Sequence, residues 1–486
     1  MNLLDGSQYY LTRFCFQRAL AFIYFIGFLI LVNQGLPLLG ARGLLPAKNF
    51  LKRVNFWDAP GIFWLDSSDR FFRTMAWLGL ALATLALTGI SDAHGMVLST
   101  LVWLALWVLY LSFVGIGQTF YGFGWETLLL ETGFLAIFLG SQDSEPPVVV
   151  FWLLRWVLFR VMFGAGLIKL RGDPCWRDLT CMNYHYETQP LPNPLSYFLH
   201  RLPANVHKLS VLVTHIIELP IPFGFFGPGI VRWIAGGLTI LFQLTLIFSG
   251  NLSWLNYVTI VLAISCFDDQ LLSHVFTLSH ALHGQMGWVR VGVLCALALL
   301  ILWLSIKPTL NLFSRRQRMN ASFDRLHLVN TYGAFGSITR ERMELVLQGT
   351  ADVFVTPQSK WLEYEFKAKP GNPARRPPLV SPYHYRLDWQ MWFAAMSSFD
   401  EHLWILNLLA KLLQNDGPVL SLIAHNPFPA APPKHIRIQH YLYTFTDLKD
   451  GGDAWWHRTL VAEYLRPLSL EDPGFRNVLL QMRWVE

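Results

Sequence analysis

Charged residues are scarce in this chain of 486 residues. Asp, Glu, Lys and Arg together make up 14% of the sequence, whereas hydrophobic residues make up 53%. Soluble domains carry about 25% charged residues. The scarcity excludes an ordinary soluble protein and predicts a polytopic membrane protein. The 20 tryptophans and 36 phenylalanines fit that class, because aromatic side chains gather at membrane interfaces.

Several catalytic and binding signatures are also missing. The chain has no Gly-x-Ser-x-Gly elbow, no phosphate-binding loop and no dinucleotide fingerprint. These absences exclude a recognisable lipase, kinase or dehydrogenase. The net charge of +6 comes without a basic tail, so nucleic acid is not expected as a partner. The spacing of His185 and Glu187 differs from a helical zinc motif, so we expect no metal site, and the residues indicate no particular cofactor.

Cysteine is rare, with five residues in the whole chain. Cys175 and Cys181 are the two that lie close together in a polar segment. Their spacing leaves two interpretations open, a disulfide formed in an oxidising compartment or two free thiols.

Long hydrophobic runs, by contrast, are plentiful, and each approaches the roughly 20 residues that a bilayer requires. They predict eight or nine membrane segments in residues 1–306. Two of the stretches are short enough to be re-entrant or buried. The expected segments are 19–39, 72–90, 95–117, 124–140 (short), 148–170, 209–227, 229–249, 252–267 (short) and 287–306.

The composition changes at Lys307. Residues 307–320 form a basic linker, and residues 321–486 then alternate apolar and polar side chains with a period of two in several places. The pattern predicts a β-rich, sandwich-like soluble domain after the α-helical membrane domain. Strands are expected at 342–349, 361–369 and 441–447, with one helical stretch at 389–413.

Basic residues cluster after the first and the last expected spans, at 42–53 and 307–318. The positive-inside rule would place both clusters in the cytoplasm. Arg13 and Arg18 flank the first span on its other side, so the bias is weak.

Ionisable side chains inside the apolar segments are candidates for function, because burying charge in a membrane is costly. Glu126 and Glu131 lie in one short segment, and Arg160 and Lys169 lie in the next. A desolvated Lys169 can act as a base or nucleophile. The alternative is a lysine that reaches from the end of its helix to the membrane surface.

A polar segment, 171–207, follows Lys169, and within it "NYHYETQPLP" (183–192) is dense in hydrogen-bonding side chains. We expect its prolines to keep it out of regular helix and its side chains to close one polar pocket beside the helices of Glu131 and Lys169. The candidates for catalysis are Lys169, His185 and Glu187. The remaining pocket residues are Glu126, Glu131, Arg160, Asp173, Trp176, Tyr184 and Gln189. A structural interpretation competes, because such a segment must satisfy its own backbone groups.

A second polar group is expected in the soluble domain, within "SPYHYRLDWQMWF" (381–393). We interpret it as a structural polar network. Its members are Arg386, Asp388, Trp389 and Gln390.

Five blocks of the sequence resemble the signature blocks of the lipase maturation factor family, in the expected order. They are "YGFGWETLLLETGFLAIF" (121–138), "KLRGDPCWRDLTCMNYHYETQPLPNPLSYFLHRLP" (169–203), "NTYGAFGSITRERMEL" (330–345), "WLEYEFKAKPGNPARRPPLVSPYHYRLDWQMWFAA" (361–395) and "NPFP" (426–429). The resemblance implies a multi-pass membrane protein that contacts membrane lipid and helps a client protein such as a lipase to mature. It implies the endoplasmic reticulum membrane for animal relatives, or the inner membrane if this shorter chain is bacterial.

A shorter block, "AGLIKLRGDPCW" (165–176), is similar to the lysine-bearing segment of the vitamin K-dependent γ-glutamyl carboxylase. That similarity implies an alternative function, a membrane enzyme that uses Lys169 as a base on a lipid, quinone-like or peptide substrate. A maturation factor without covalent chemistry remains the main hypothesis.

Overall fold

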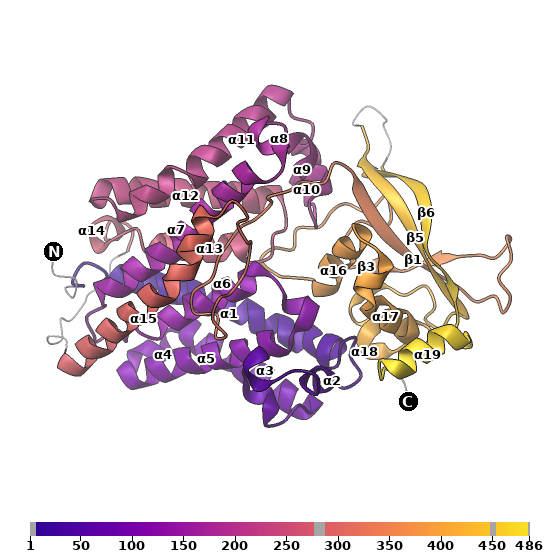
Figure 1. Cartoon of the computed structure of the whole chain (residues 1–486), viewed down its shortest axis with the longest axis horizontal. Coiled ribbons are helices and arrows are strands. Elements are labelled where there is room, and N and C mark those ends of the chain that lie inside the picture. Colours follow the sequence, from indigo (N-terminus) through magenta and orange to yellow (C-terminus); the bar gives the residue numbers. More distant parts are fainter. Residues whose placement is uncertain (1–5, 277–286, 448–452, 485–486) are drawn as a thin grey trace.

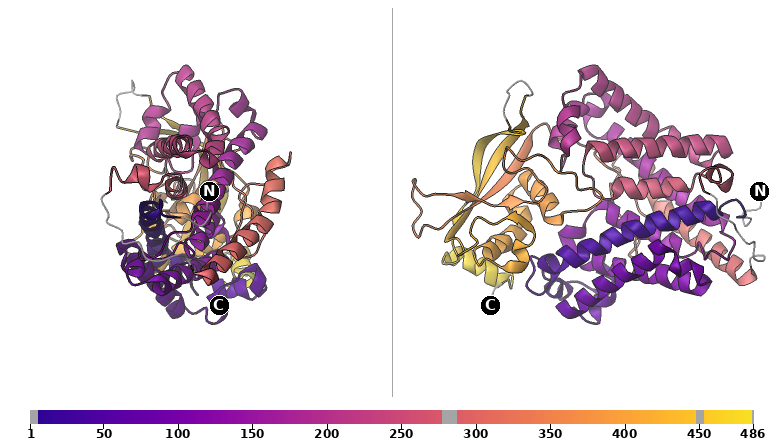
Figure 2. Two further views of the ribbon diagram at one scale, coloured as in Figure 1. Left: turned by 90° about the vertical axis from the view of Figure 1, so that its left-hand side faces the viewer. Right: turned by 180° about the vertical axis from the view of Figure 1, so that it is seen from behind.

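The computed structural model describes residues 6–276, 287–447 and 453–484. Helices occupy the chain up to Phe313, and a domain with two β-sheets follows. Figure 1 shows this C-terminal domain at one end of the helical bundle, while helix α1 begins at the opposite end. The view from behind shows α1 running along the bundle toward the C-terminal domain (Figure 2).

Seven helices in the described residues are long and apolar enough to cross a membrane. The fifth of them combines α11 with the 3-10 helix η4. These helices are α1 (Tyr10–Leu39), α3 (Asp69–Thr88), α5 (Met96–Ile116), α7 (Val148–Arg171), α11 with η4 (Ala204–Glu218 and Ile221–Phe226), α12 (Gly229–Ser249) and α15 (Trp288–Phe313).

The two short apolar stretches form the short helices α6 (Gly124–Ala136) and α13 (Leu255–Ile264). With 13 and 10 residues they fall short of the roughly 20 that a bilayer requires. Both pack among the longer helices, and most of their residues are buried. The described part of the chain therefore has seven membrane-length helices, where the sequence predicted eight or nine segments.

Local sequence explains how the helices begin and how they pack. The hydroxyl of Ser68 accepts a hydrogen bond from the backbone N–H of Phe71 at 3.2 Å and so caps the start of α3. Gly79 of α3 lies against the ring of Phe28 in α1, and a Cβ at Gly79 would fall 2.2 Å from that ring. Glycine at this position permits the two helices to approach closely.

The shorter elements of the helical part connect the spans. The α-helices among them are α2 (Ala47–Leu51), α4 (Ile90–Ala93), α8 (Pro174–Arg177), α9 (Met182–Thr188), α10 (Pro194–Leu199) and α14 (Asp269–Leu272). The 3-10 helices are η1 (Phe56–Asp58), η2 (Ile62–Trp64) and η3 (Gln118–Tyr121).

The C-terminal domain contains an antiparallel sheet of four strands in the order β2-β1-β5-β6 and a second sheet of two strands, β3-β4. In the main sheet Val346 is paired with Gln439 and Leu442 with Thr459. The strands are β1 (Arg342–Thr350), β2 (Leu362–Glu363), β3 (Glu365–Phe366), β4 (Ile423–His425), β5 (His435–Phe445) and β6 (Trp456–Leu468).

The β-rich prediction is confirmed, with one local difference. The expected strand at 361–369 is divided into the two-residue strands β2 and β3, because the chain leaves the main sheet at Tyr364 and joins the second sheet. The layer between the main sheet and the membrane helices is helical (Figure 1). It contains α16 (Arg386–Ala395), which packs on β1, and then η5 (Phe399–His402), α17 (Trp404–Leu412) and α18 (Gly417–Leu420); α19 (Pro473–Gln481) packs on α17.

The boundary between the two domains lies slightly later than the sequence suggests. Helix α15 continues to Phe313, so the first half of the basic linker at 307–320 is the last part of this helix. Pro308 lies inside the helix and is tolerated there.

Candidate functional site

The polar segment after Lys169 is largely helical, contrary to the expectation that its prolines would prevent helix. Helix α9 ends at Thr188, and the first proline after it is Pro190, so the prolines act only after the helix has ended. The segment is also cross-linked, because Cys175 and Cys181 form a disulfide. The disulfide resolves the two interpretations that the sequence left open.

Lys169 lies near the C-terminal end of α7 and forms a buried ion pair with Glu218 at the end of α11. Its Nζ lies 2.5 Å from Oε1 and 2.6 Å from Oε2 of Glu218. The ammonium group also lies 5.3 Å from the ring centre of Trp176. The partner carboxylate therefore holds Lys169 inside the protein and away from the membrane surface.

The side chain of His185, in α9, lies close to the ion pair of Lys169 and Glu218. Only 6% of its surface is exposed, and its imidazole has no hydrogen-bond partner among the described residues. The ring packs edge-on against Phe335. Burial, and secondarily the charge of Lys169, lowers the pKa of His185 to about 4, so the imidazole is neutral at neutral pH.

A cavity of about 390 Å³ joins these groups. Its volume falls within the roughly 300–1,000 Å³ of small-molecule pockets. Lys169, Glu218 and His185 line it together with Trp176 and residues 332–337 of the segment that follows α15. The rest of the lining is mostly apolar and comes from α6, α7, α9, α11, α12, α13, α16 and the connecting segments.

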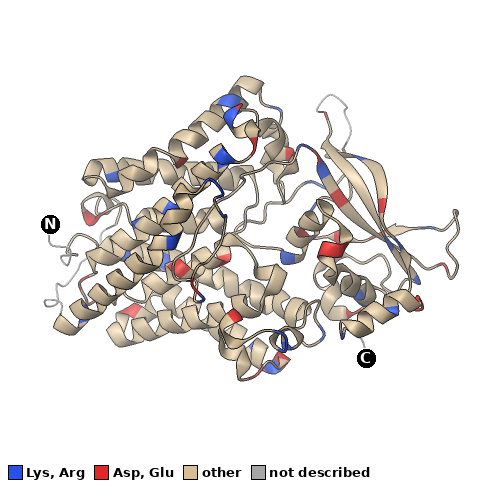
Figure 3. Ribbon diagram, in the orientation of Figure 1, with Lys and Arg blue, Asp and Glu red and all other residues tan. Residues whose placement is uncertain are grey.

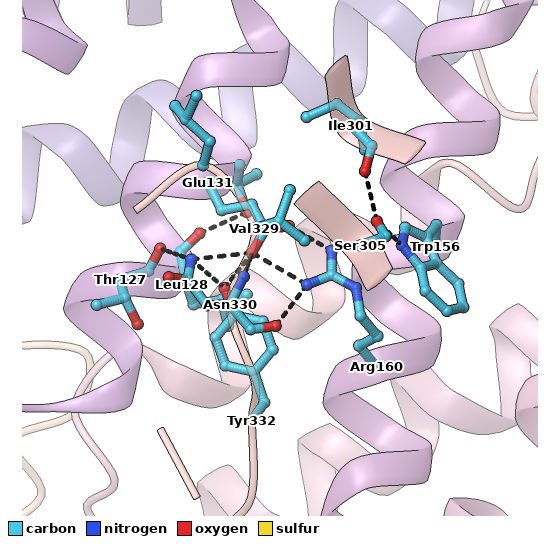
Figure 4. A network of polar contacts seen from close by, with 12 residues as sticks. Thr127, Leu128, Glu131, Trp156, Arg160, Ile301, Ser305, Val329, Asn330 and Tyr332 are labelled. Carbon is cyan, nitrogen blue, oxygen red and sulfur yellow. Dashed lines mark hydrogen bonds and ion pairs between the residues drawn. The ribbon is translucent and has the colours of Figure 1, made fainter. Parts of the chain in front are cut away.

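Glu131 of α6 lies in a separate, buried polar network, shown in Figure 4. Its carboxylate forms an ion pair with Arg160 of α7 and accepts hydrogen bonds from the Asn330 backbone N–H at 3.0 Å, the Asn330 amide at 3.0 Å and the Tyr332 hydroxyl at 2.6 Å. Arg160 also donates to the backbone oxygen of Asn330 at 2.6 Å. The network binds the segment after α15 to two membrane-domain helices.

Glu126, five residues earlier on α6, bonds to the C-terminal domain instead. Its carboxylate lies 2.8 Å from the guanidinium of Arg386, and the Tyr110 hydroxyl donates to it as well. Arg386 also donates to the backbone oxygen of Phe120 at 2.7 Å, and both members of the ion pair are fully buried. The two glutamates that the sequence assigned to one pocket thus serve two different contacts.

The remaining predicted residues of the polar segment contact the C-terminal part of the chain. Asp173 forms an ion pair with Arg340 at 2.7 Å, which lowers the pKa of that carboxyl to about 2. The guanidinium of Arg340 lies over the ring of Tyr184. The Glu187 carboxylate accepts a hydrogen bond from the backbone N–H of Phe445 in β5 at 2.7 Å, although burial raises the pKa of Glu187.

Arg342 at the start of β1 is a residue that the sequence analysis missed. Its guanidinium donates to the backbone oxygens of Glu187 at 2.9 Å and Pro190 at 3.0 Å, and to that of Gln189. The carboxylate of Glu344 lies 2.5 Å from the guanidinium of Arg342 and neutralises its charge. The Gln189 amide in turn donates to Ser196 and to the backbone of Ser249, so the segment is bonded on both sides.

The predicted network at 386–390 is divided in the same way. Asp388 accepts hydrogen bonds from the backbone N–H groups of Ala368 at 2.5 Å and Lys369 at 3.0 Å, within the C-terminal domain. Gln390 donates to the backbone oxygen of Thr119 at 2.6 Å, across to the membrane domain. Trp389 lines the cavity.

The residues expected to form one polar pocket are therefore distributed over several sites. Lys169, Trp176 and His185 line the cavity, and the others form domain contacts or helix contacts. Glu218 was also missed, although an acid in the middle of the apolar run 209–227 was a signal that could have identified it. Within the described residues no group of three His, Cys, Asp or Glu side chains is placed to hold a metal ion.

The fold and the site define a class of protein: a multi-pass membrane protein whose helices carry few charges (Figure 3) and whose β-rich domain is joined to them by a buried ion pair. Residues 11–274 match the profile of the lipase maturation factor transmembrane domain, and residues 328–466 match that of the lipase maturation factor C-terminal domain. The chain belongs to the lipase maturation factor family.

The relatives are similar over nearly the whole chain. Lipase maturation factor 1 of Bos taurus is 45% identical, over 99% of this chain and 92% of the relative, and that of Homo sapiens is 45% identical over 98% and 91%. Lipase maturation factor 2 of Homo sapiens is 31% identical, over 98% of this chain and 85% of its own length. No solved structure matches the chain.

Proposed function

We propose that this protein is a membrane-embedded maturation factor for lipases, and that it acts by binding a folding client rather than by covalent chemistry. The observation that carries the proposal is the similarity to lipase maturation factors 1 and 2 through both domains. The relatives' names give no support to the carboxylase-like alternative. Lys169, which would be the base of such an enzyme, is neutralised by Glu218.

The proposal places the C-terminal domain in an oxidising compartment, the lumen of the endoplasmic reticulum. The disulfide between Cys175 and Cys181 supports this side, because disulfides persist in oxidising compartments. Asp173, close to the disulfide, is paired with Arg340 beside the C-terminal domain.

The positive-inside rule, applied to the basic residues, gives the opposite orientation for the C-terminal domain. The cluster at 42–53 lies on the side of the C-terminal domain, since Arg42 is paired with Asp416 and Asn49 donates to the backbone of Arg483. The positive-inside bias is weak here, however, because Arg13 and Arg18 flank α1 on its other side. The disulfide is therefore the stronger argument for orientation.

Strand β6 is the element that we propose to contact the client. It is an outer strand of the main sheet within the described residues, and residues 459–463 are all exposed. Leu460 and Val461 are each 55% exposed. An outer strand with free backbone groups and apolar side chains can pair with an extended segment of an unfolded protein.

The test is the secretion of active lipase from cells that lack their own maturation factor and express this protein. We expect wild-type protein to restore secreted activity. Replacing Leu460 and Val461 by lysine should reduce it at least about fivefold without changing the amount of the factor, since lysine on an outer strand opposes pairing. Leu480→Lys, on exposed α19 of the same domain, is the matched control. Failure of the wild-type protein with every lipase tried would contradict the proposed function, whereas an active β6 variant would contradict only the role of β6.

A further inference from the structure

The cavity beside Lys169 contains polar groups that the contacts described so far do not use. His185 and Asn256 are both buried and line the cavity, and neither side chain has a hydrogen-bond partner among the described residues. The amide of Gln243, also in the lining, donates to the sulfur of Met162 at 3.5 Å and to no other described residue. Buried polar groups in folded proteins are nearly always hydrogen-bonded, so such groups around a cavity indicate a ligand that completes them.

The positions of these groups set the shape of the ligand. Lys169 lies near the C-terminal end of α7 and His185 lies close to it, whereas Val161 and Met162 lie about two turns earlier along α7. Eight residues of helix correspond to roughly 12 Å. Phe242, Leu246 and Leu255 belong to the apolar lining. A ligand must therefore be elongated and mostly apolar, with polar atoms at the end nearer His185 and again beside Asn256.

The charges of the lining set the chemistry of the ligand. Lys169 and Glu218 neutralise each other, and among the residues that the structure describes no other charged side chain lines the cavity. An anionic headgroup would disrupt that pair, and a cationic one would compete with Lys169 for Glu218. Burying an unpaired charge is far more costly than burying a hydroxyl or an ester oxygen that finds a partner.

We propose that this cavity binds one uncharged membrane lipid of the glyceride type, whose hydroxyl or ester oxygens bond to His185 and Asn256. The neutral imidazole of His185 can donate to such an oxygen or accept from a hydroxyl. The acyl chain lies between α7, α12 and α13. The site is distinct from the client-binding role proposed above and does not depend on it.

The test is photo-cross-linking of the purified full-length protein, in the absence of any lipase, with a monoacylglycerol that carries a diazirine on its acyl chain. We expect labelled peptides from α7, α12 or α13. Unlabelled monoacylglycerol should compete for this labelling, and a phosphatidylserine or a free fatty acid at the same concentration should not. Labelling that the charged lipids suppress equally well would overturn the proposal.

Two variants test the two parts of the site. Ala165→Leu places three carbons into the cavity and should reduce labelling at least about tenfold. Gly237→Leu is its matched control, because a Cβ at Gly237 meets nothing within 4 Å and Gly237 does not line the cavity, and it should label like wild type. His185→Phe keeps an aromatic ring but removes the hydrogen bond, for which we expect a loss of roughly three- to tenfold.

The outcome is decided by these comparisons. Equal labelling of Ala165→Leu, Gly237→Leu and wild type would show that the probe lies on the outer surface and would overturn the proposal. The proposal would also be overturned if α7, α12 or α13 cross-linked to a client peptide that monoacylglycerol does not displace. Since no lipase is present in the lipid assay, its failure leaves the maturation function unaffected.

Discussion

The carboxylate of Glu126 and the guanidinium of Arg386 lie 2.8 Å apart, with both side chains fully buried, although 260 residues separate them in the chain. The pair joins helix α6 of the membrane domain to helix α16 of the C-terminal domain. Arg386 also stacks on the ring of Tyr121, 3.4 Å from its centre. The two domains are thus joined by buried charges that neutralise each other across their boundary.

Replacing Arg386 by methionine is expected to destabilise the protein by about 3–5 kcal/mol, because it leaves Glu126 buried without its counter-charge. The double variant, Glu126→Leu with Arg386→Met, should recover most of that loss, since removing both charges of a buried pair is often nearly neutral. Thermal unfolding in detergent measures the stability of the single and of the double variant. Arg42→Met is the control, because Arg42 is 80% exposed and its pair with Asp416 at 3.4 Å is weak. A loss in Arg386→Met no larger than in the control would contradict the role of the pair.

Asn330 provides a second test with a smaller change. Its amide donates to Glu131 at 3.0 Å, to the backbone oxygen of His327 at 2.9 Å and to Tyr332 at 3.2 Å. Asn330→Asp removes these donors and places a second carboxylate beside Glu131, so we expect a loss of stability of at least about 3 kcal/mol. The yield of folded protein and its melting temperature report the effect. Asn372→Asp makes the same chemical change at an exposed position of the C-terminal domain, keeps the side-chain oxygen that accepts from the backbone N–H of Ala374, and should leave both unchanged.

The sequence predicted the architecture of this protein better than its contacts. Hydrophobic runs give the membrane helices directly, because a span requires a certain length of apolar residues. The alternating pattern at 342–349 gave β1 for a similar reason, since the period of two follows from local geometry. The interpretation of 361–369 as a single strand was wrong. The chain passes from one sheet to the other at Tyr364, and this transfer depends on the partner strands.

The ionisable residues within apolar segments are unusual in the sequence, but their partners could not be predicted from it. Glu126 and Glu131 are five residues apart on one helix and so point in different directions. Their partners, Arg386 and Arg160, lie 260 and 29 residues away. Pairing at such separations depends on the packing of whole helices and domains, and a single sequence contains no periodic signal for it.

His185 predicts a dependence of stability on pH. Its pKa is about 4 in the folded protein and about 6.5 in an unfolded chain, so the unfolded chain binds the proton more tightly. The stability that depends on neutral His185 is therefore complete above pH 6.5 and is lost as the pH falls toward 4, at up to about 1.4 kcal/mol per pH unit. His200 also has a pKa of about 4 and contributes in the same direction.

Melting temperatures measured from pH 7.5 to 4.5 check this dependence. We expect wild-type protein to lose stability throughout the lower part of that range, and His185→Phe to show a slope smaller by about one proton. His94→Phe, at an exposed position, should keep the wild-type slope. Identical slopes for His185→Phe and wild type would mean that His185 is accessible to protons in the folded state.

The disulfide gives a prediction for both stability and orientation. Cys175 and Cys181 are six residues apart, and a loop of that size is expected to stabilise the folded state by about 2 kcal/mol. Replacing both by serine should lower the melting temperature, and a reductant should lower that of wild type to the same value. Cys295→Ser removes an exposed free thiol and should change neither. In intact cells, alkylation before reduction should leave Cys175 and Cys181 unmodified, and alkylation after reduction should label both. Full alkylation of Cys175 and Cys181 without reductant would place this side of the membrane in a reducing compartment and contradict the proposed orientation of the C-terminal domain.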